Sequence, residues 1–116
     1  MEGLNALHKQ EICHRNIKPE NILVVISATG QPTIQIANFD FATSMKDKDT
    51  PLELTVGTKL FMAPELINKE PYGTEVDIWA VGVTAFYLLS YGHYPFPGIT
   101  KAVVENKIKN EEPDFA

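Results

Sequence analysis

The hydrophobic positions between residues 22 and 91 predict a hairpin and one long helix. Residues 22–26 and 33–36 are short β-rich runs, and the glycine and proline between them predict a turn that joins two strands. Residues 74–91 are apolar with no polar face, which predicts a helix that is buried all round. Gly92 follows at the position where such a helix would stop.

The two ends of the chain predict further helices. Residues 4–11 have apolar positions at helical spacing but no preceding N-cap, so they are expected to be the end of a helix. Residues 100–109 form an amphipathic pattern, and Thr100 is a suitable N-cap.

The uninterrupted apolar part of residues 74–91 is too short to cross a bilayer, and no membrane partner is expected. The whole pattern predicts a mainly α fold with a small β-hairpin.

Composition narrows the classes of function. The 116 residues are 44% hydrophobic and 22% charged, which is typical of one small globular domain. A net charge of −5 argues against nucleic acid as a partner. Cys13 is the single cysteine, and the three histidines lack zinc-ligand spacing, so neither a disulfide framework nor a zinc site is expected. With no signal peptide or lipidation motif, the expected location is intracellular and cytoplasmic.

A polar loop at residues 14–21 carries the candidate chemistry. It reads H-R-N-I-K-P-E-N and resembles the catalytic loop of serine/threonine protein kinases, H-R-D-[LI]-K-P-E-N, except at Asn16. In that family the aspartate is the catalytic base and the last asparagine, here Asn21, holds magnesium. An amide does not accept a proton near neutral pH, so the resemblance implies that Asn16 lacks the base function, whereas Lys18 could still position phosphate.

A second departure falls on the magnesium site of the family. Residues 36–42 align with the segment centred on D-F-G, and Asn38 stands where the aspartate chelates magnesium. The resemblance implies weak metal affinity, with Asp40 as an alternative carboxylate two residues away. Phe39 keeps its packing role in either case. Leu23 matches the residue beneath the adenine ring of ATP, although a core leucine would fit equally well.

The following polar loop occupies the position of the kinase activation loop. The resemblance implies that Arg15 could pair with a phosphate on Thr50 or Thr55. A solvated loop without modification is the open alternative, because polar loops of this composition are common.

Residues 57–65 read G-T-K-L-F-M-A-P-E and resemble the end of the kinase activation region. The resemblance implies that Thr58 contacts Lys18. It also implies that Glu65 has a structural role, buried against an arginine that this chain does not contain. In kinases this segment shapes the substrate groove, so binding of a protein segment could persist without catalysis.

Residues 77–83 read D-I-W-A-V-G-V and resemble the central helix of the kinase C-lobe. The resemblance implies that Asp77 binds the backbone around His14 and Arg15, which gives His14 and Asp77 structural roles. The chain ending and the I-C-H-R run resemble the calcium/calmodulin-dependent group of the family.

The resemblance extends from Leu4 to Phe115, so residues 1–116 are expected to be one partial kinase C-lobe of α+β class. The resemblance implies that the Gly-rich loop and the lysine of V-A-I-K belong to an N-lobe that precedes these residues, and that the last C-lobe helices are not among them. The expected function is that of an inactive pseudokinase that binds a protein partner or host complex and uses no cofactor. The alternatives are part of an active kinase using ATP and magnesium, a free-standing assembly subunit, or a degenerate product without settled function.

Overall fold

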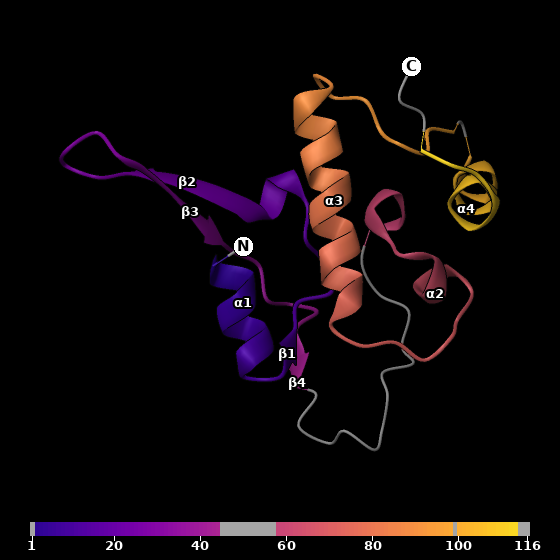
Figure 1. Ribbon diagram of the computed structural model, residues 1–116, viewed down its shortest axis with the longest axis horizontal. Coiled ribbons are helices and arrows are strands. Elements are labelled where there is room, and N and C mark those ends of the chain that lie inside the picture. The colour runs from indigo at the N-terminus through magenta and orange to yellow at the C-terminus, as the bar shows by residue number, and fades with distance from the viewer. Residues whose placement is uncertain (1, 45–57, 99, 114–116) are drawn as a thin grey trace.

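The computed structural model of the chain describes residues 2–44, 58–98 and 100–113. A central helix, α3, separates α1 and a long hairpin on one side from α2 and α4 on the other (Figure 1). In chain order the elements are α1 (Glu2–Lys9), β1 (Ile12–Cys13), the 3-10 helix η1 (Pro19–Asn21), β2 (Ile22–Ile26), β3 (Pro32–Ile36), β4 (Thr43–Ser44), the 3-10 helix η2 (Lys59–Phe61), α2 (Pro64–Ile67), α3 (Glu75–Leu89) and α4 (Lys101–Asn110). The predicted mainly α architecture with a small hairpin, of α+β class, is confirmed.

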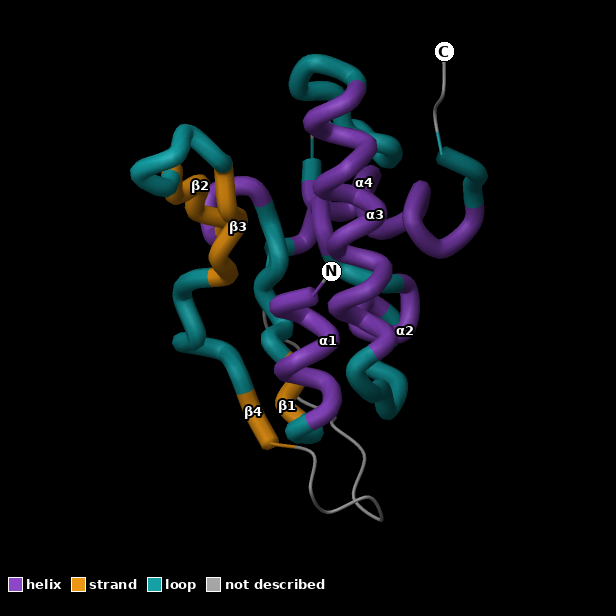
Figure 2. Tube along the Cα trace, turned by 60° about the vertical axis from the view of Figure 1, so that its left-hand side comes forward, coloured by secondary structure: helices purple, strands orange, loops and turns teal. Residues whose placement is uncertain are grey.

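Within the described residues, two separate antiparallel sheets accompany the helices (Figure 2). The predicted hairpin is formed by β2 and β3, in a register that runs from Ile22 opposite Ile36 to Ile26 opposite Pro32. Gly30 turns the chain with a φ of 81°, a conformation that glycine adopts without steric cost. The second sheet pairs β1 with β4 and places Thr43 opposite Cys13, the residue that directly precedes the 14–21 loop.

The prediction that the central apolar helix is buried all round is wrong. One face of α3 is buried, but Ile78, Leu88 and Leu89 on the other sides are 48%, 60% and 82% exposed. A helix that is apolar in every direction contains no sequence signal for the side on which its neighbours pack. The tertiary arrangement selects that side.

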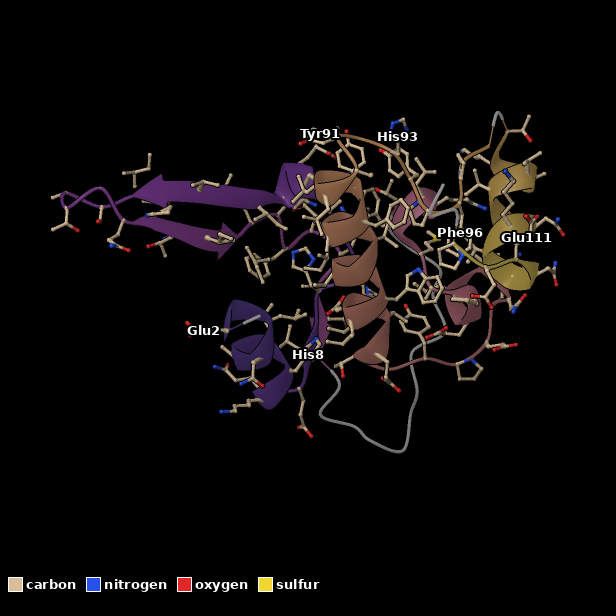
Figure 3. The ribbon with its side chains drawn as sticks, turned by 45° about the horizontal axis from the view of Figure 1, so that its top comes forward. Glu2, His8, Tyr91, His93, Phe96 and Glu111 are labelled. Atoms are coloured by element: carbon tan, nitrogen blue, oxygen red, sulfur yellow. The ribbon has the colours of Figure 1, made fainter. Side chains whose placement is uncertain are left out.

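The end of α3 differs in detail from the glycine stop that was predicted. Tyr91 is the first residue in the left-handed region, with a φ of 59°, and Gly92 follows with a φ of 95°. The backbone N–H of Gly92 donates to the carbonyl of Tyr87 at 2.8 Å, which satisfies a terminal carbonyl of the helix. Both residues therefore turn the chain, and Tyr91 does so although it has a side chain (Figure 3).

The predicted N-cap of the last helix is confirmed. The Thr100 hydroxyl accepts the backbone N–H of Val103 at 3.3 Å, at the start of α4. This bond satisfies one of the N–H groups that the first helical turn leaves without a partner.

In the part of the chain that the structure describes, two hydrophobic clusters form the core, and Trp79 of α3 packs against both. Its ring stacks on Phe96 with centroids 6.0 Å apart and planes 12° from parallel. The first cluster contains Cys13, Met62, Ala63, Leu66, Ile67, Tyr72, Val76, Phe96, Val104 and Ile108. The second contains Leu4, Ile17, Phe61, Ala80 and Val83. Among the described residues, no helix has the length and apolar character needed to cross a membrane.

Candidate functional site

The 14–21 loop is fixed at its start by the buried carboxylate of Asp77. The backbone N–H groups of His14 and Arg15 donate to the two oxygens of Asp77, each at 2.8 Å. His8 of α1 lies 3.0 Å from the same carboxylate through its Nε2 atom. The contact that the resemblance implied between Asp77 and the loop is present, and it explains a carboxylate on an apolar helix.

His14 joins the loop to the segment that follows the hairpin. Its Nδ1 accepts the backbone N–H of Asn16 at 3.2 Å, and its Nε2 lies 3.0 Å from the carbonyl oxygen of Ala37. This arrangement requires the proton on Nε2, which then donates to the carbonyl. The ring also makes an edge contact with Phe39, at a centroid distance of 5.2 Å. His14 thereby holds the residues around Asn38 beside the loop.

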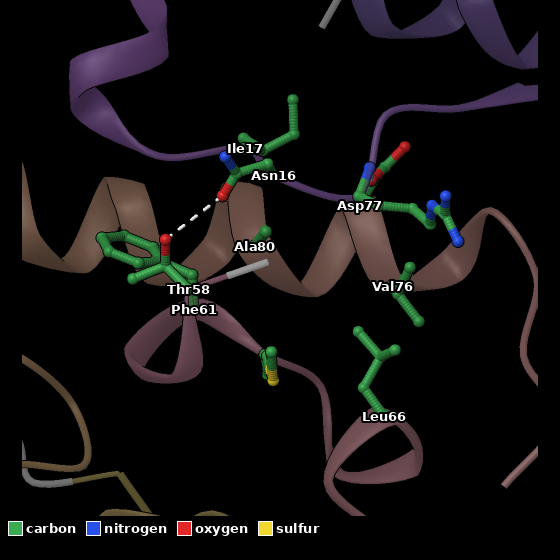
Figure 4. A pocket seen from close by; sticks show the side chains of 10 residues that line it. Asn16, Ile17, Thr58, Phe61, Leu66, Val76, Asp77 and Ala80 are labelled. Atoms are coloured by element: carbon green, nitrogen blue, oxygen red, sulfur yellow. Dashed lines mark hydrogen bonds between the residues drawn. The ribbon is translucent and has the colours of Figure 1, made fainter. Parts of the chain in front are cut away.

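Asn16, Lys18 and Thr58 meet in a hydrogen-bonded chain. Lys18 Nζ donates to the Thr58 hydroxyl at 3.0 Å, and that hydroxyl donates to Asn16 Oδ1 at 3.2 Å (Figure 4). The contact expected between Thr58 and Lys18 is therefore present. Asn16 is 7% exposed, and its side-chain oxygen accepts the hydrogen bond from the Thr58 hydroxyl. An amide has no atom basic enough to take up a proton near neutral pH.

Two further amide side chains, those of Asn21 and Asn38, extend this hydrogen-bonded chain. Asn21 Nδ2 donates to the backbone oxygen of Asn16 at 2.8 Å, and Asn38 Nδ2 donates to Asn21 Oδ1 at 3.3 Å. Asn38 has a φ of 59°, which asparagine tolerates better than most residues with a side chain. Asn21 thus contacts Asn38 side chain to side chain and Asn16 through its backbone oxygen, and all three side chains are uncharged amides.

These donors do not fit a magnesium ion. Magnesium prefers anionic oxygens in an octahedral arrangement. Asn21 and Asn38 supply only neutral amide oxygens, and Asn21 Oδ1 already accepts a hydrogen bond from Asn38. Asp40 reaches the cluster through its backbone N–H, which donates to Asn38 Oδ1 at 3.3 Å. No group of three or more His, Cys, Asp or Glu residues that could hold a metal occurs within the described part of the chain.

The cavity beside Asn16 is small. Its volume is about 10 Å³, and residues from the 14–21 loop, the 58–66 region and α3 line it (Figure 4). That volume is about one water molecule, so this internal space accommodates no larger ligand.

A larger groove lies between η2 and the start of α4. Its volume is about 460 Å³, and it is lined by Thr58, Lys59, Leu60, Gly98, Thr100, Lys101 and Val104. An ion pair between Lys59 and Glu105 links the two sides. The groove includes residues 58–60 of the segment expected to bind a protein and the start of the helix from Thr100, while binding itself stays a prediction.

Arg15 is held on the surface near the expected activation loop. Its Nε donates to the carbonyl of Phe41 at 2.6 Å, and Nη1 donates to the Tyr72 hydroxyl at 3.1 Å. Thr50 and Thr55 lie outside the described residues, so their pairing with Arg15 stays a prediction.

Two further predicted positions have less defined surroundings. Leu23 lies on β2 and is 49% exposed, and Glu65 is partly buried in the first turn of α2. Their roles beneath adenine and against an arginine stay predictions. Sequence reasoning did not identify His8 as a neighbour of Asp77, or Ala37 and Tyr72 as neighbours of the loop, because each contact joins residues at least 23 positions apart.

Comparison with known proteins agrees with this geometry. Residues 1–115 match the family model described as protein kinase domain. Death-associated protein kinase 2 of Homo sapiens is 40% identical over 101 residues, which cover 87% of this chain and 27% of that protein. Serine/threonine-protein kinase DCLK1 of Rattus norvegicus is 44% identical over 96 residues, which cover 83% of this chain and 21% of that protein.

A third relative, serine/threonine-protein kinase ULK3 of Xenopus laevis, is 38% identical over 106 residues, covering 91% of this chain and 22% of that protein. The chain thus spans 21% to 27% of the length of these relatives. The resemblance to serine/threonine kinases, nearest the calcium/calmodulin-dependent group, is confirmed. This chain belongs to the protein kinase family.

Proposed function

We propose that this chain is a catalytically inactive kinase C-lobe that acts by binding another protein. The observation that carries the proposal is the state of Asn16, whose amide oxygen accepts the Thr58 hydroxyl at 3.2 Å. The atom at the position of the catalytic base is therefore a neutral hydrogen-bond acceptor. Loss of a general base typically lowers a rate by about 10²- to 10⁴-fold.

The metal position supports the same conclusion. Phosphoryl transfer in this family depends on magnesium ions that neutralise charge on the phosphates. Asn38 and Asn21 bind each other through their amides at 3.3 Å, and neither supplies negative charge. Weak or absent magnesium-dependent ATP binding follows from this donor set. ATP and magnesium are accordingly not expected as cofactors.

The groove between η2 and α4 supports a role in binding. Kinase substrates lie along the corresponding segment in the family, and here the groove keeps a volume of about 460 Å³. The lining mixes the apolar side chains of Leu60 and Val104 with the polar groups of Thr58, Lys59 and Lys101. An extended segment of a protein partner would fit this combination of apolar and polar walls.

Residual phosphoryl transfer is the alternative function. Lys18 and Asn21 remain in place, and the contact of Lys18 with Thr58 at 3.0 Å keeps its ammonium group beside the loop. In that case the protein would transfer phosphate from ATP to a protein through an unconventional metal site.

Two measurements on the whole protein separate these functions. Calorimetric titration with ATP in the presence and absence of magnesium should detect no magnesium-dependent binding, and a phosphotransfer assay with a generic protein substrate should detect no turnover. Magnesium-dependent ATP binding accompanied by turnover would contradict the proposal and support the alternative.

The binding role is tested by charge reversal in the groove. Partners captured by the wild-type protein should be lost from the Lys101→Glu variant, because Lys101 lines the groove. Lys109→Glu is the matched control, since it changes an exposed lysine on the same helix at a position outside that lining. Equal capture by both variants would show that the groove is not the binding surface.

A further inference from the structure

The β2–β3 hairpin projects from the helical body (Figures 1 and 3), and several of its apolar side chains are exposed. Val24, Ile26 and Ile34 are 65%, 70% and 69% exposed. Isolated two-stranded hairpins are marginally stable in water, and a further strand or a packed helix usually supports them. The outer half of this hairpin has no such support among the described residues.

The exposed side chains share one face of the hairpin. Side chains alternate between the two faces along each strand, and residues opposite each other point to the same side. In the observed register Val24 lies opposite Ile34, and Ile26 lies opposite Pro32. This face is therefore apolar on both strands. Its inner end is covered by α1, because a methyl group added at Gly3 would lie only 3.4 Å from Ile36 Cδ1.

The hydrogen-bond pattern shows which backbone groups of β2 point outward. Ser27 N–H donates to the Gln31 carbonyl and Ala37 N–H donates to the Asn21 carbonyl, so the odd-numbered residues of β2 face β3. The N–H and C=O groups of Val24 and Ile26 then point away from β3. The carbonyl of Ile22 points outward as well, whereas the N–H of Ile22 donates to the Pro19 carbonyl at the end of η1.

The edge of β2 is more open to a new strand than the edge of β3. Pro32 begins β3 and has no N–H, which is a common way of protecting an edge. The helix α1 contacts β3 at Ile36 and restricts approach from that side. Every residue of β2 is Ile, Leu or Val, without charge or proline.

The β2 edge is self-complementary. An antiparallel pairing of two β2 strands centred on Val24 places Val24 opposite the partner's Val24 and Ile22 opposite the partner's Ile26. Such a two-fold arrangement uses the same surface on both copies. Residues 21–39 contain no Asp, Glu, Lys or Arg, so the two hairpins can meet without repulsion even though each chain has a net charge of −5.

We propose that two copies of this protein associate through their β2 edges to form a four-stranded antiparallel sheet. The Val24 residues exchange both of their backbone hydrogen bonds, and each Ile26 N–H donates to the Ile22 carbonyl of the other copy. The apolar side chains of the two β2 strands become direct cross-strand neighbours. Backbone pairing at a sheet edge supplies the affinity, and the two-fold register supplies the specificity.

Sedimentation velocity of the whole protein over a wide range of concentrations tests this proposal. The wild-type protein should show a reversible monomer–dimer equilibrium. Val24→Lys should weaken dimerisation about tenfold or more, because the pairing brings the two lysines directly opposite each other. Ile34→Lys is the matched control: Ile34 has nearly the same exposure and shares the face, but lies on the other strand.

Charge complementation makes the test specific for the two-fold axis. Val24→Lys and Val24→Glu should each dimerise about tenfold or more weakly than the wild type when alone, and an equimolar mixture should recover the dimer. A wild-type protein that stays monomeric at every concentration would overturn the proposal. Loss of the dimer in Ile34→Lys with retention in Val24→Lys would also overturn it, as would failure of the mixture to associate. Circular dichroism on each variant checks that these exposed substitutions leave the fold intact.

Discussion

Asp77 accepts the backbone N–H of His14 at 2.8 Å, although 63 positions separate the two residues in the sequence. The same carboxylate accepts the N–H of Arg15 and contacts His8, and it is 1% exposed. Asp77 therefore links α1, the 14–21 loop and α3. A single buried charged group organises the part of the chain that carries the candidate site.

Replacing Asp77 with asparagine should destabilise the protein by about 2 to 4 kcal/mol. The amide has one accepting oxygen, and its NH₂ group would face a donating N–H, which leaves a buried polar group without a partner. Urea denaturation measures the change. Asp40→Asn is the control, since Asp40 is exposed and its substitution should stay within about 0.5 kcal/mol of wild type. Similar losses in both variants would argue against the linking role of Asp77.

Cys13 should make stability fall at alkaline pH. Burial raises the pKa of the Cys13 thiol far above its ordinary value of 9.0, and the negative charge of Asp77 raises that pKa further. The unfolded chain ionises its thiol as pH rises past about 9, whereas the folded chain keeps it neutral. The stabilisation that comes from keeping the thiol neutral is therefore fully present below that pH, and it is lost progressively as the pH rises above it.

Denaturation of wild type and Cys13→Ala at a series of pH values from neutral to alkaline measures this effect. The alanine variant should lose less stability over the alkaline range than the wild type does. Burial also raises the pKa of Tyr94, which contributes with the same sign, so Tyr94→Phe serves to separate the two contributions. Equal slopes for wild type and Cys13→Ala would contradict the expected role of the thiol.

Tyr91→Gly should stabilise the protein by about 1 kcal/mol. Tyr91 has a φ of 59°, in a region where a side chain costs energy and glycine does not. The Tyr91 residue is 98% exposed, so little packing is lost. Thermal unfolding should show a higher midpoint. Leu89→Gly, which places glycine inside the last helical turn, should lower it instead.

Restoring two carboxylates should create a magnesium response. The Asn16→Asp, Asn38→Asp variant adds two carboxylates near Asn21, whose side chain contacts the Asn38 side chain and the backbone oxygen of residue 16 in the wild type. Added magnesium should raise the thermal midpoint of the variant and leave the wild type unchanged. A third substitution, Asn21→Ala, should reduce the response. If magnesium does not raise the thermal midpoint of the double variant, features other than the two amides prevent metal binding.

Local patterns in the sequence determined most of the elements. The β-rich runs around Gly30 and Pro32 predicted the hairpin, and Thr100 predicted the start of α4. These features depend on neighbouring residues, whose steric and hydrogen-bonding preferences act over a few positions. The motif at residues 14–21 also identified Asn16 as the position where the chemistry changes. The resemblance placed Lys18 beside Thr58, a pairing that local preferences do not contain.

Packing between distant segments decided the rest. The apolar pattern of α3 did not indicate which face its neighbours cover, and Leu89 at 82% exposure was therefore misjudged. The hydrogen bond from Thr58 to Asn16 spans 42 positions and depends on where η2 meets α3. The open edge of β2 follows from the hydrogen-bond register and from α1 lying beside β3. Long-range contacts fix these features because many side chains from separate elements must be satisfied together, and no short stretch of sequence contains that information.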